Sequence, residues 1–188
     1  TGVEFIVQSV DSKPYRRRPA APFMTSTLQQ EASGRFGFSA SRTMGAAQKL
    51  YEEGHITYMR TDSTTLSADA LSAARTLIRE RFGQDQLPAD ARSYKKKVKN
   101  AQEAHEAIRP AGDAWRDPVD LGFKGDKADS DQARLYQLIW SRTIASQMND
   151  AEGQTVTIRL AASPSGSETY EFGTSGTVIT SPGFLAVY

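Results

Sequence analysis

Cysteine is absent from the 188-residue chain, which excludes disulfide bonds and thiolate metal sites within it. Only two histidines are present, so the sequence offers no evident two-histidine metal site. There is no secretory signal pattern and no apolar run of about 18 residues, the length that a membrane-spanning helix needs. We therefore expect a protein of the reducing cytosol with no membrane partner. Because the chain opens on a strand-like segment without a methionine, we expect a piece of a longer protein.

The chain has little net charge, only +1, but its charged residues are unevenly distributed. The first part of the sequence is basic and the second part is acidic. Residues 1–110 hold 17 Lys/Arg against 12 Asp/Glu, and residues 111–188 hold 6 against 10. Two basic clusters stand out, Arg16–Arg18 and Lys95–Lys97 with Lys99. Such clusters contact phosphates in some proteins and are solvated loops in more, so charge alone favours the second explanation.

Apolar periodicity predicts about five helices in the middle of the chain, four of them with serine or threonine at the start. The expected helices run from Thr25 or Ser26 to Phe36 with Gly37 as the stop, from Ser39 or Ser41 to Gly54, from Ser67 to Phe82 before Gly83, from Ala101 to Ile108 before Arg109-Pro110, and from Ser130 or Asp131 onward. The expected buried positions are Met44, Ala47, Leu50 and Tyr51 in the second helix and Leu135, Leu138, Ile139, Trp140 and Ile144 in the last.

Strand patterns flank this helical region on both sides. Residues 3–10 favour a strand, which is followed by a basic, proline-containing connector over 13–22. Alternation returns after residue 154 and predicts antiparallel strands at 155–160, 168–172 and 177–179. We therefore predict a multi-domain α+β chain in which a helical domain, 19–146, is inserted into a partial antiparallel β domain, 1–18 and 147–188.

The densest polar run is Thr57–Ser63, and it contains a tyrosine and an arginine two residues apart. In an extended segment, Tyr58 and Arg60 project from the same face. A guanidinium there favours the phenolate and can bind the oxygens of a phosphodiester, which suits a tyrosine nucleophile. The spacing alone is unspecific, and a half-buried tyrosine beside a salt-bridged arginine is the more common explanation for it.

Two further polar runs accompany the first. In Asn100–Pro110, His105 can donate a hydrogen bond to a phosphate oxygen or be satisfied locally by Glu103 or Asp62, while Glu103 and Glu106 are expected to cap or pair. In Pro22–Gln30, hydroxyl groups and unpaired N–H groups meet at an expected helix start. That arrangement is equally compatible with an anion site and with simple capping.

Taken together and in this order, Ala21–Gln30, Ala46–Tyr51, His55–Ser63 and Asn100–Pro110 resemble the type IA DNA topoisomerases, in the bacterial topoisomerase I form. The likeness covers most of residues 20–148 and is weaker in the flanking strands. It implies that Tyr58 is the nucleophile, that Arg60 holds the scissile phosphate and that His105 assists. Other positions in these runs are candidates for DNA contacts: Thr25, Ser26, Gln29, Thr57, Thr61, Asp62, Ser63 and Arg109.

The resemblance also implies a mechanism and partners. One DNA strand is cleaved through a 5′-phosphotyrosyl bond, a second strand passes, and religation relaxes negative supercoils without ATP. Single-stranded and negatively supercoiled DNA are the expected substrates, in the bacterial cytoplasm at the nucleoid. The family binds Mg²⁺ in a separate acidic domain, and this chain has no Asp-x-Asp-x-Glu cluster; capping or solvation explains Asp126, Asp129 and Asp131 better. The chain alone is therefore expected to be inactive without the remaining domains of a parent enzyme.

Three alternatives remain open at this point. The basic clusters and helical core suit a nucleic-acid binding module without chemistry equally well. A segment of a topoisomerase III-like enzyme or reverse gyrase is a second alternative, although the residue sequence of Ala104–Pro110 favours bacterial topoisomerase I. A purely structural protein is the third, and it leaves the combination of Tyr58, Arg60 and His105 as coincidence. His55 also departs from the family, which often has an aromatic residue at that position.

Overall fold

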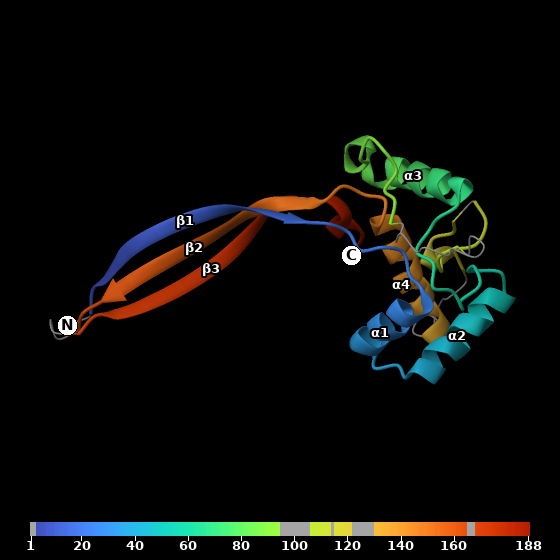
Figure 1. Ribbon diagram of the computed structural model, residues 1–188, viewed down its shortest axis with the longest axis horizontal. Helices are drawn as coiled ribbons and strands as arrows, with labels where there is room; N and C mark the ends of the chain where they lie inside the picture. The colour runs from blue at the N-terminus through green and yellow to red at the C-terminus, as the bar shows by residue number, and fades with distance from the viewer. Residues whose placement is uncertain (1–2, 95–105, 114, 122–129, 165–167) are drawn as a thin grey trace, which may run out of the picture. The chain divides into compact units, whose positions relative to one another are not determined.

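The computed structural model describes residues 3–94, 106–113, 115–121, 130–164 and 168–188. Two compact units divide the chain (Figure 1): a β unit of Thr1–Arg18 with Asp150–Gly183, and a helical unit of Pro19–Asn149 with Phe184–Tyr188. The mixed α+β class is thus confirmed. The helical unit interrupts the β unit in sequence, and whether the two units are the domains of an intact protein stays a prediction.

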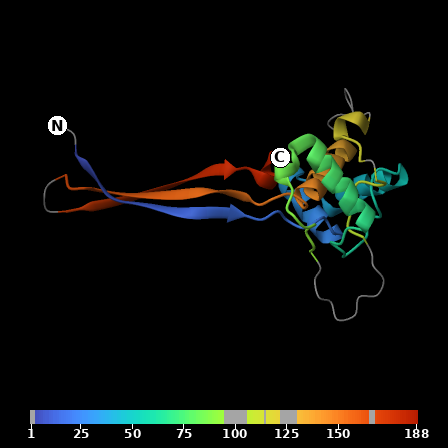
Figure 2. The same cartoon turned by 90° about the horizontal axis from the view of Figure 1, so that it is seen from above.

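Three long antiparallel strands form the β unit, in the order β1-β2-β3 (Figure 2). They are β1 (Phe5–Arg17), β2 (Ala151–Ala162) and β3 (Tyr170–Ser181). The expected connector over 13–22 was wrong for its first half, because β1 continues through Arg17. An edge strand accommodates Pro14, whose missing N–H need not donate to a neighbour. The separate strands expected at 168–172 and 177–179 are one continuous strand, β3.

One face of this sheet is apolar. Residues directly opposite each other in a ladder share a face, so the register places Val7, Leu160 and Phe172 together. The rings of Phe5 and Phe172 lie on the same face, 5.6 Å apart between centroids. Both remain at least half exposed, at 57% and 50%. The apolar residues of this face are Phe5, Val7, Val10, Val156, Ile158, Leu160, Ala162, Tyr170, Phe172 and Val178, and Ser12, Gln154 and Thr174 lie among them.

A close backbone approach between β2 and β3 requires glycine at position 153. A Cβ at position 153 would overlap the carbonyl oxygen of Val178, at the irregularity in the β2–β3 register. We expect Gly153→Ala to destabilise the β unit by about 1–3 kcal/mol, because the backbone must shift to admit the methyl group. Hydrogen exchange of β2 and β3 amides measures the loss. Gly176→Ala is the matched control, since a Cβ there meets nothing within 4 Å; equal effects of the two variants would contradict the steric argument.

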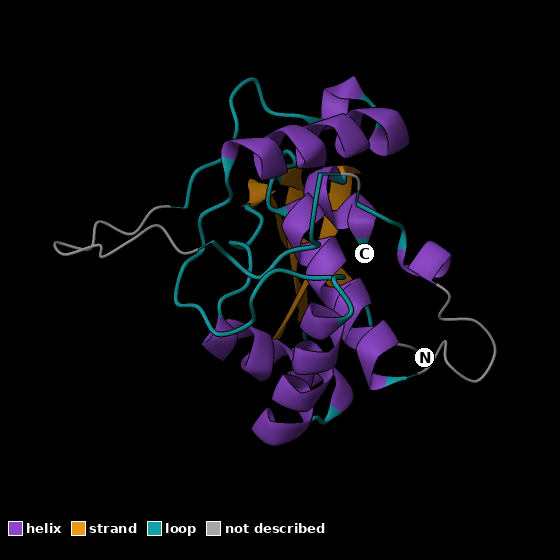
Figure 3. Cartoon of the chain, turned by 90° about the vertical axis from the view of Figure 1, so that its right-hand side faces the viewer, coloured by secondary structure: helices purple, strands orange, loops and turns teal. Residues whose placement is uncertain are grey.

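Four helices appear in the described part of the helical unit, and loops connect them (Figure 3). They are α1 (Thr25–Phe36), α2 (Ala40–Glu52), α3 (Ala68–Phe82) and α4 (Asp131–Ala145). The expected serine caps of the last three are confirmed, because Ser39, Ser67 and Ser130 each accept a hydrogen bond from the backbone N–H three residues on. Gly37 ends α1 in the left-handed conformation, as expected, at φ 67°.

Helix α4 packs against each of the other three helices and supplies much of the core. Its five predicted apolar residues, Leu135, Leu138, Ile139, Trp140 and Ile144, are all buried. The C-terminal 3₁₀ turn, Gly183–Val187, brings Phe184 back to this unit, and its N–H donates to the carbonyl of Asn149 at 2.9 Å. The core therefore assembles around one helix, and the loops that carry the polar runs contribute apolar residues to it, among them Phe23, Ile56 and Ile108.

Three expectations for the helical unit were wrong. The described end of the predicted 101–108 helix is not helical, because Ile108 forms an isolated bridge with Phe23 and Pro110 forms one with Ile56; residues 101–105 lie outside the described ranges. Helix α1 is capped at Met24 rather than by a hydroxyl residue. Tyr51, expected in the buried face of α2, is 42% exposed.

Candidate active site

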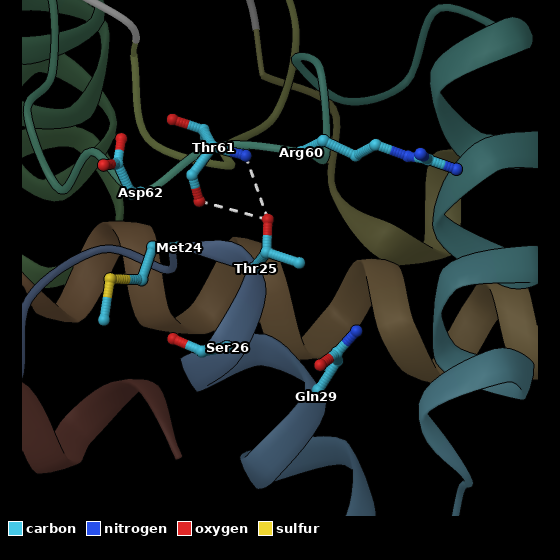
Figure 4. A pocket seen from close by; sticks show the side chains of 7 residues that line it. All are labelled: Met24, Thr25, Ser26, Gln29, Arg60, Thr61 and Asp62. Carbon is cyan, nitrogen blue, oxygen red and sulfur yellow. Dashed lines mark hydrogen bonds between the residues drawn. The ribbon is translucent and has the colours of Figure 1, made fainter.

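The start of α1 is fastened to the segment that carries Tyr58. The backbone N–H of Thr25 donates to the carbonyl of Thr61 at 2.9 Å. The Thr25 hydroxyl donates to the carbonyl of Met59 at 2.7 Å. It also accepts from the N–H of Thr61 at 2.9 Å (Figure 4). This hydroxyl therefore fixes the Tyr58 segment from one side instead of capping the helix.

A second set of hydrogen bonds fastens the same segment to the 107–111 loop. The N–H of Thr57 donates to the carbonyl of Arg109, and the N–H of Ala111 donates to the carbonyl of His55, both at 2.9 Å. The hydroxyl of Thr57 donates to the carbonyl of Ala107 at 2.8 Å and accepts from the N–H of Arg109 at 3.0 Å. Thr57 is thus satisfied internally by its backbone and its side chain.

The first and third polar runs, Pro22–Gln30 and Asn100–Pro110, are also hydrogen-bonded to each other. The N–H of Ile108 donates to the carbonyl of Phe23 at 2.8 Å, and the N–H of Ala107 donates to that of Thr65 at 2.9 Å. The three polar runs, far apart in the sequence, therefore meet in one hydrogen-bonded clasp. We use this name for the contacts among residues 23–25, 55–65 and 107–111.

Tyr58 projects outward from the clasp. Its side chain is 49% exposed, while Ile56 and Met59 beside it are buried to 2% and 1% exposure. Arg60 is exposed as well. Among the described residues, no ion pair or hydrogen bond engages the Arg60 guanidinium, so the salt-bridged arginine considered from the sequence is not found there. An accessible phenol and an available cation thus come from neighbouring exposed positions.

A pocket of about 500 Å³ opens beside this segment, between the start of α1 and the residues that follow Tyr58. Arg60 leaves the strand-like segment on one side of Thr61 and extends toward α2, whereas Asp62 lies on the other side (Figure 4). Ser26 and Gln29 project from α1 below them. The lining residues are Met24, Thr25, Ser26, Gln29, Arg60, Thr61 and Asp62. Five of the predicted DNA contacts, with Arg60, are thereby brought together.

Arg109 and Ser63 are placed differently from those five. Arg109 is only 8% exposed, and its guanidinium donates to Glu106 at 3.0 and 2.8 Å and to the carbonyls of Pro110 and Gly112 at 2.8 and 3.0 Å. The Ser63 hydroxyl accepts from the N–H of Thr65 in a local turn. We therefore leave Arg109 out of the proposed DNA contact surface and assign it to the support of the loop.

The expectation that Glu106 caps or pairs is confirmed. Its carboxylate accepts from the backbone N–H of Ser67 at 2.8 Å, at the cap of α3, as well as from Arg109. Partial burial opposes ionisation, but the hydrogen bonds from Arg109 and Ser67 outweigh it and hold the pKa of Glu106 below its usual value. The i,i+3 spacing to Arg109 was the available signal for this ion pair.

Glu106→Gln is expected to lower the stability of the helical unit by about 1–3 kcal/mol at neutral pH, because Arg109 loses its charged partner. A lowered pKa in the folded state means that the stabilisation is present above the ordinary glutamate pKa, about 4.3, and is lost as the pH falls through the lower folded value. The difference in melting temperature between wild type and variant should therefore shrink in acid. Glu80→Gln, at an exposed position of α3, is the control; a difference independent of pH would contradict the assignment.

Several residues singled out in the sequence lie outside the described ranges. They are His105, Glu103, Asp126, Asp129 and the lysines of 95–99. In the other basic cluster, Arg16–Arg18, the Arg16 side chain pairs with the buried carboxylate of Asp150 at 2.6 Å. Part of this cluster is therefore neutralised within the β unit.

Metal and membrane features are not found in the described part of the chain. Asp131 pairs with Arg42 at 2.7 Å, which links α4 to α2. No group of three or more acidic or histidine side chains among the described residues is placed to hold a metal ion. Nor is any helix in those ranges both long enough and apolar enough to cross a bilayer.

An exposed tyrosine, an exposed arginine without a partner among the described residues and a pocket lined largely by polar side chains form an arrangement suited to phosphoryl transfer. The family model described as DNA topoisomerase matches residues 1–188. The chain belongs to the DNA topoisomerase family.

Similar proteins named DNA topoisomerase 1 occur in several bacteria. The chain is 58% identical to the Streptomyces coelicolor protein over 98% of its own length, and 56% identical to the Mycolicibacterium smegmatis protein over 100%. It is 47% identical to the Synechococcus elongatus protein over 97%. In each case it spans about a fifth of the relative, 19–20%. The solved structure of full-length topoisomerase I from Thermotoga maritima matches 97% of this chain and 29% of that chain, with 34% identity and a TM-score of 0.69.

Proposed function

We propose that this chain is the tyrosine-bearing part of a longer bacterial type IA DNA topoisomerase, and that Tyr58 is the nucleophile. The observation that carries the proposal is the exposure of Tyr58 on a segment held rigidly by the clasp, next to an Arg60 with no partner among the described residues. A nucleophile needs access to its substrate and a fixed position, and both are met here. Membership of the DNA topoisomerase family supports the same conclusion.

The proposed reaction exchanges one phosphodiester for another. The phenolic oxygen of Tyr58 attacks the phosphorus of one DNA strand, the bond from phosphorus to the 3′-oxygen breaks, and the phenolic proton leaves while the 3′-oxygen gains one. Tyr58 then carries the 5′-phosphate, and the 3′-hydroxyl reverses the reaction after a second strand has passed. Because the number of phosphoester bonds is unchanged, the cycle relaxes negative supercoils without ATP.

The residues of the pocket have proposed roles in binding the substrate. Arg60 holds the non-bridging oxygens of the scissile phosphate and stabilises the charge that develops on them. Ser26, Gln29 and Asp62 line a pocket large enough for part of a nucleotide, so we propose that single-stranded DNA enters there. His105 is proposed to assist at the phosphate, and its position lies outside the described ranges.

We propose that the metal ion and the other groups needed for the reaction are supplied by the rest of the longer enzyme. The described residues do not fit a metal site, so Mg²⁺ is proposed to bind other domains of that enzyme. Those domains are also the proposed partners of this chain, and the bacterial nucleoid its proposed place of action. For the same reason, the 188-residue chain alone is expected not to relax supercoiled DNA; robust Mg²⁺-dependent relaxation by the purified chain would contradict this division of labour.

The polarity of the covalent bond tests the proposal. The longer enzyme is incubated with Mg²⁺ and single-stranded DNA labelled at the 5′ or the 3′ end, and the reaction is quenched with denaturant. We expect an adduct that retains the 3′-labelled DNA downstream of the break. DNA binding without any adduct would favour a binding module, and an adduct retaining the 5′ label would exclude the type IA mechanism.

A further inference from the structure

The ring of Tyr58 has a neighbour that the proposed mechanism does not use. Tyr51, in the last turn of α2, meets Tyr58 edge to face, with ring centroids 5.3 Å apart and an angle of 69° between the planes. This distance and angle lie within the range that aromatic pairs prefer. Tyr51 is 42% exposed, so the contact is made at the surface and not in the core.

The backbone around the pair is already fixed, which leaves the Tyr58 side chain as the movable part. The N–H of Gly54 donates to the carbonyl of Tyr51 at 2.9 Å, and the N–H of His55 donates to that of Leu50 at 2.8 Å. Leu50 is fully buried and anchors the last turn of α2. Tyr51 therefore stands on a rigid support, at the end of a tight turn that leads into the Tyr58 segment.

An exposed tyrosine on a fixed backbone still has several side-chain rotamers. Only one of them can aim the phenolic oxygen along the line of attack, and small misplacements of a reacting group lower rates strongly. Among the described residues, Tyr51 is the one whose ring contacts the ring of Tyr58. An edge-to-face neighbour selects one rotamer without blocking the phenolic oxygen.

We propose that Tyr51 is a positioning residue that holds the Tyr58 ring in its attacking rotamer. This inference rests on the proposed nucleophilic role of Tyr58 and extends it to a second side chain. The ring of Tyr51 positions Tyr58 through their edge-to-face contact, and the hydroxyl group of Tyr51 is not required. The aromatic preference is worth a factor of about 3–10 in the population of the productive rotamer.

Single-turnover cleavage by the longer enzyme tests the role. Tyr51→Leu removes the aromatic contact but keeps an apolar side chain, and it is expected to slow adduct formation about 3–10-fold at saturating DNA. The Kd for single-stranded DNA should stay within about twofold of wild type, since the change acts on the bound nucleophile. Tyr51→Phe keeps the ring and is expected to restore most of the rate. Melting temperatures of both variants report whether folding is affected.

A control and four outcomes complete the test. Tyr188→Leu is the matched control, because Tyr188 is also half exposed and contacts another ring, that of Phe184; its cleavage rate should equal that of wild type. A wild-type rate for Tyr51→Leu overturns the inference. So does a loss of rate in Tyr51→Phe equal to that in Tyr51→Leu, or a rate loss explained fully by weaker DNA binding. Absence of an adduct in wild type instead defeats the proposed function itself, and the inference with it.

Discussion

Tyr58→Phe in the longer enzyme is expected to reduce the covalent protein–DNA adduct to an undetectable level. The substitution removes the one atom that forms the bond to phosphorus, and no other group in the proposed reaction replaces it. The ring is retained, so the contact with Tyr51 and the burial of Ile56 and Met59 on either side should persist. Denaturing gels of labelled DNA measure the adduct, and the relaxation rate of supercoiled DNA should fall with it.

Binding separates this result from a general loss of structure. The affinity of Tyr58→Phe for single-stranded DNA is expected to stay within about twofold of wild type, since a phenolic hydroxyl is a small part of a phosphate-dominated interface. Tyr188→Phe is the control for removal of an exposed hydroxyl and should form the adduct normally. If Tyr58→Phe still forms the adduct, another residue is the nucleophile and the proposed mechanism is wrong.

The second large effect is expected at Arg60. Arg60→Ala should slow cleavage about 100–1,000-fold, the usual cost of removing one group that stabilises transition-state charge. Arg60→Lys should recover only part of this loss, because an ammonium group cannot bind two phosphate oxygens in the planar geometry of a guanidinium. Rapid-quench measurement of adduct formation at saturating DNA isolates the chemical step from binding.

A second arginine provides the comparison. Arg35 on α1 is exposed and pairs with Glu31 at 2.8 Å, so Arg35→Ala removes the same charge from the helical unit without touching the pocket. It should leave the cleavage rate within about twofold of wild type. If Arg35→Ala and Arg60→Ala slow cleavage equally, the effect comes from net charge, and the assignment of Arg60 to the phosphate fails.

Features that depend on near neighbours in sequence were predicted well. Ser39, Ser67 and Ser130 cap their helices because a cap acts within three residues. The buried side of α4 followed from its periodicity for the same reason. That the three polar runs meet at one place was predicted only through the family resemblance. Local patterns could not predict it, because the hydrogen bonds between the runs join residues tens of positions apart.

Features decided by distant partners were missed. Arg17 is in a strand because Ala151 lies opposite it, and no local pattern reveals a partner so far along the chain. Thr25 was expected to cap α1, but its hydroxyl is taken by Met59 and Thr61. Tyr51 was expected on the buried face because tyrosine is apolar enough to fit a helical stripe, but its ring contacts Tyr58 at the surface.

The pairing of β1 with β2 has a consequence for the order in which the chain folds. Roughly 130 residues separate Arg17 from its partner Ala151, so this ladder closes a long loop, which makes it slow to form. At about 5–20 residues per second, a ribosome completes β2 roughly 7–29 s after β1. During that interval β1 lacks its partner β2, and its apolar residues Phe5, Val7 and Val10 stay open to other chains. We expect the helices to fold first and the sheet to close last, although its first strand is made before any of them.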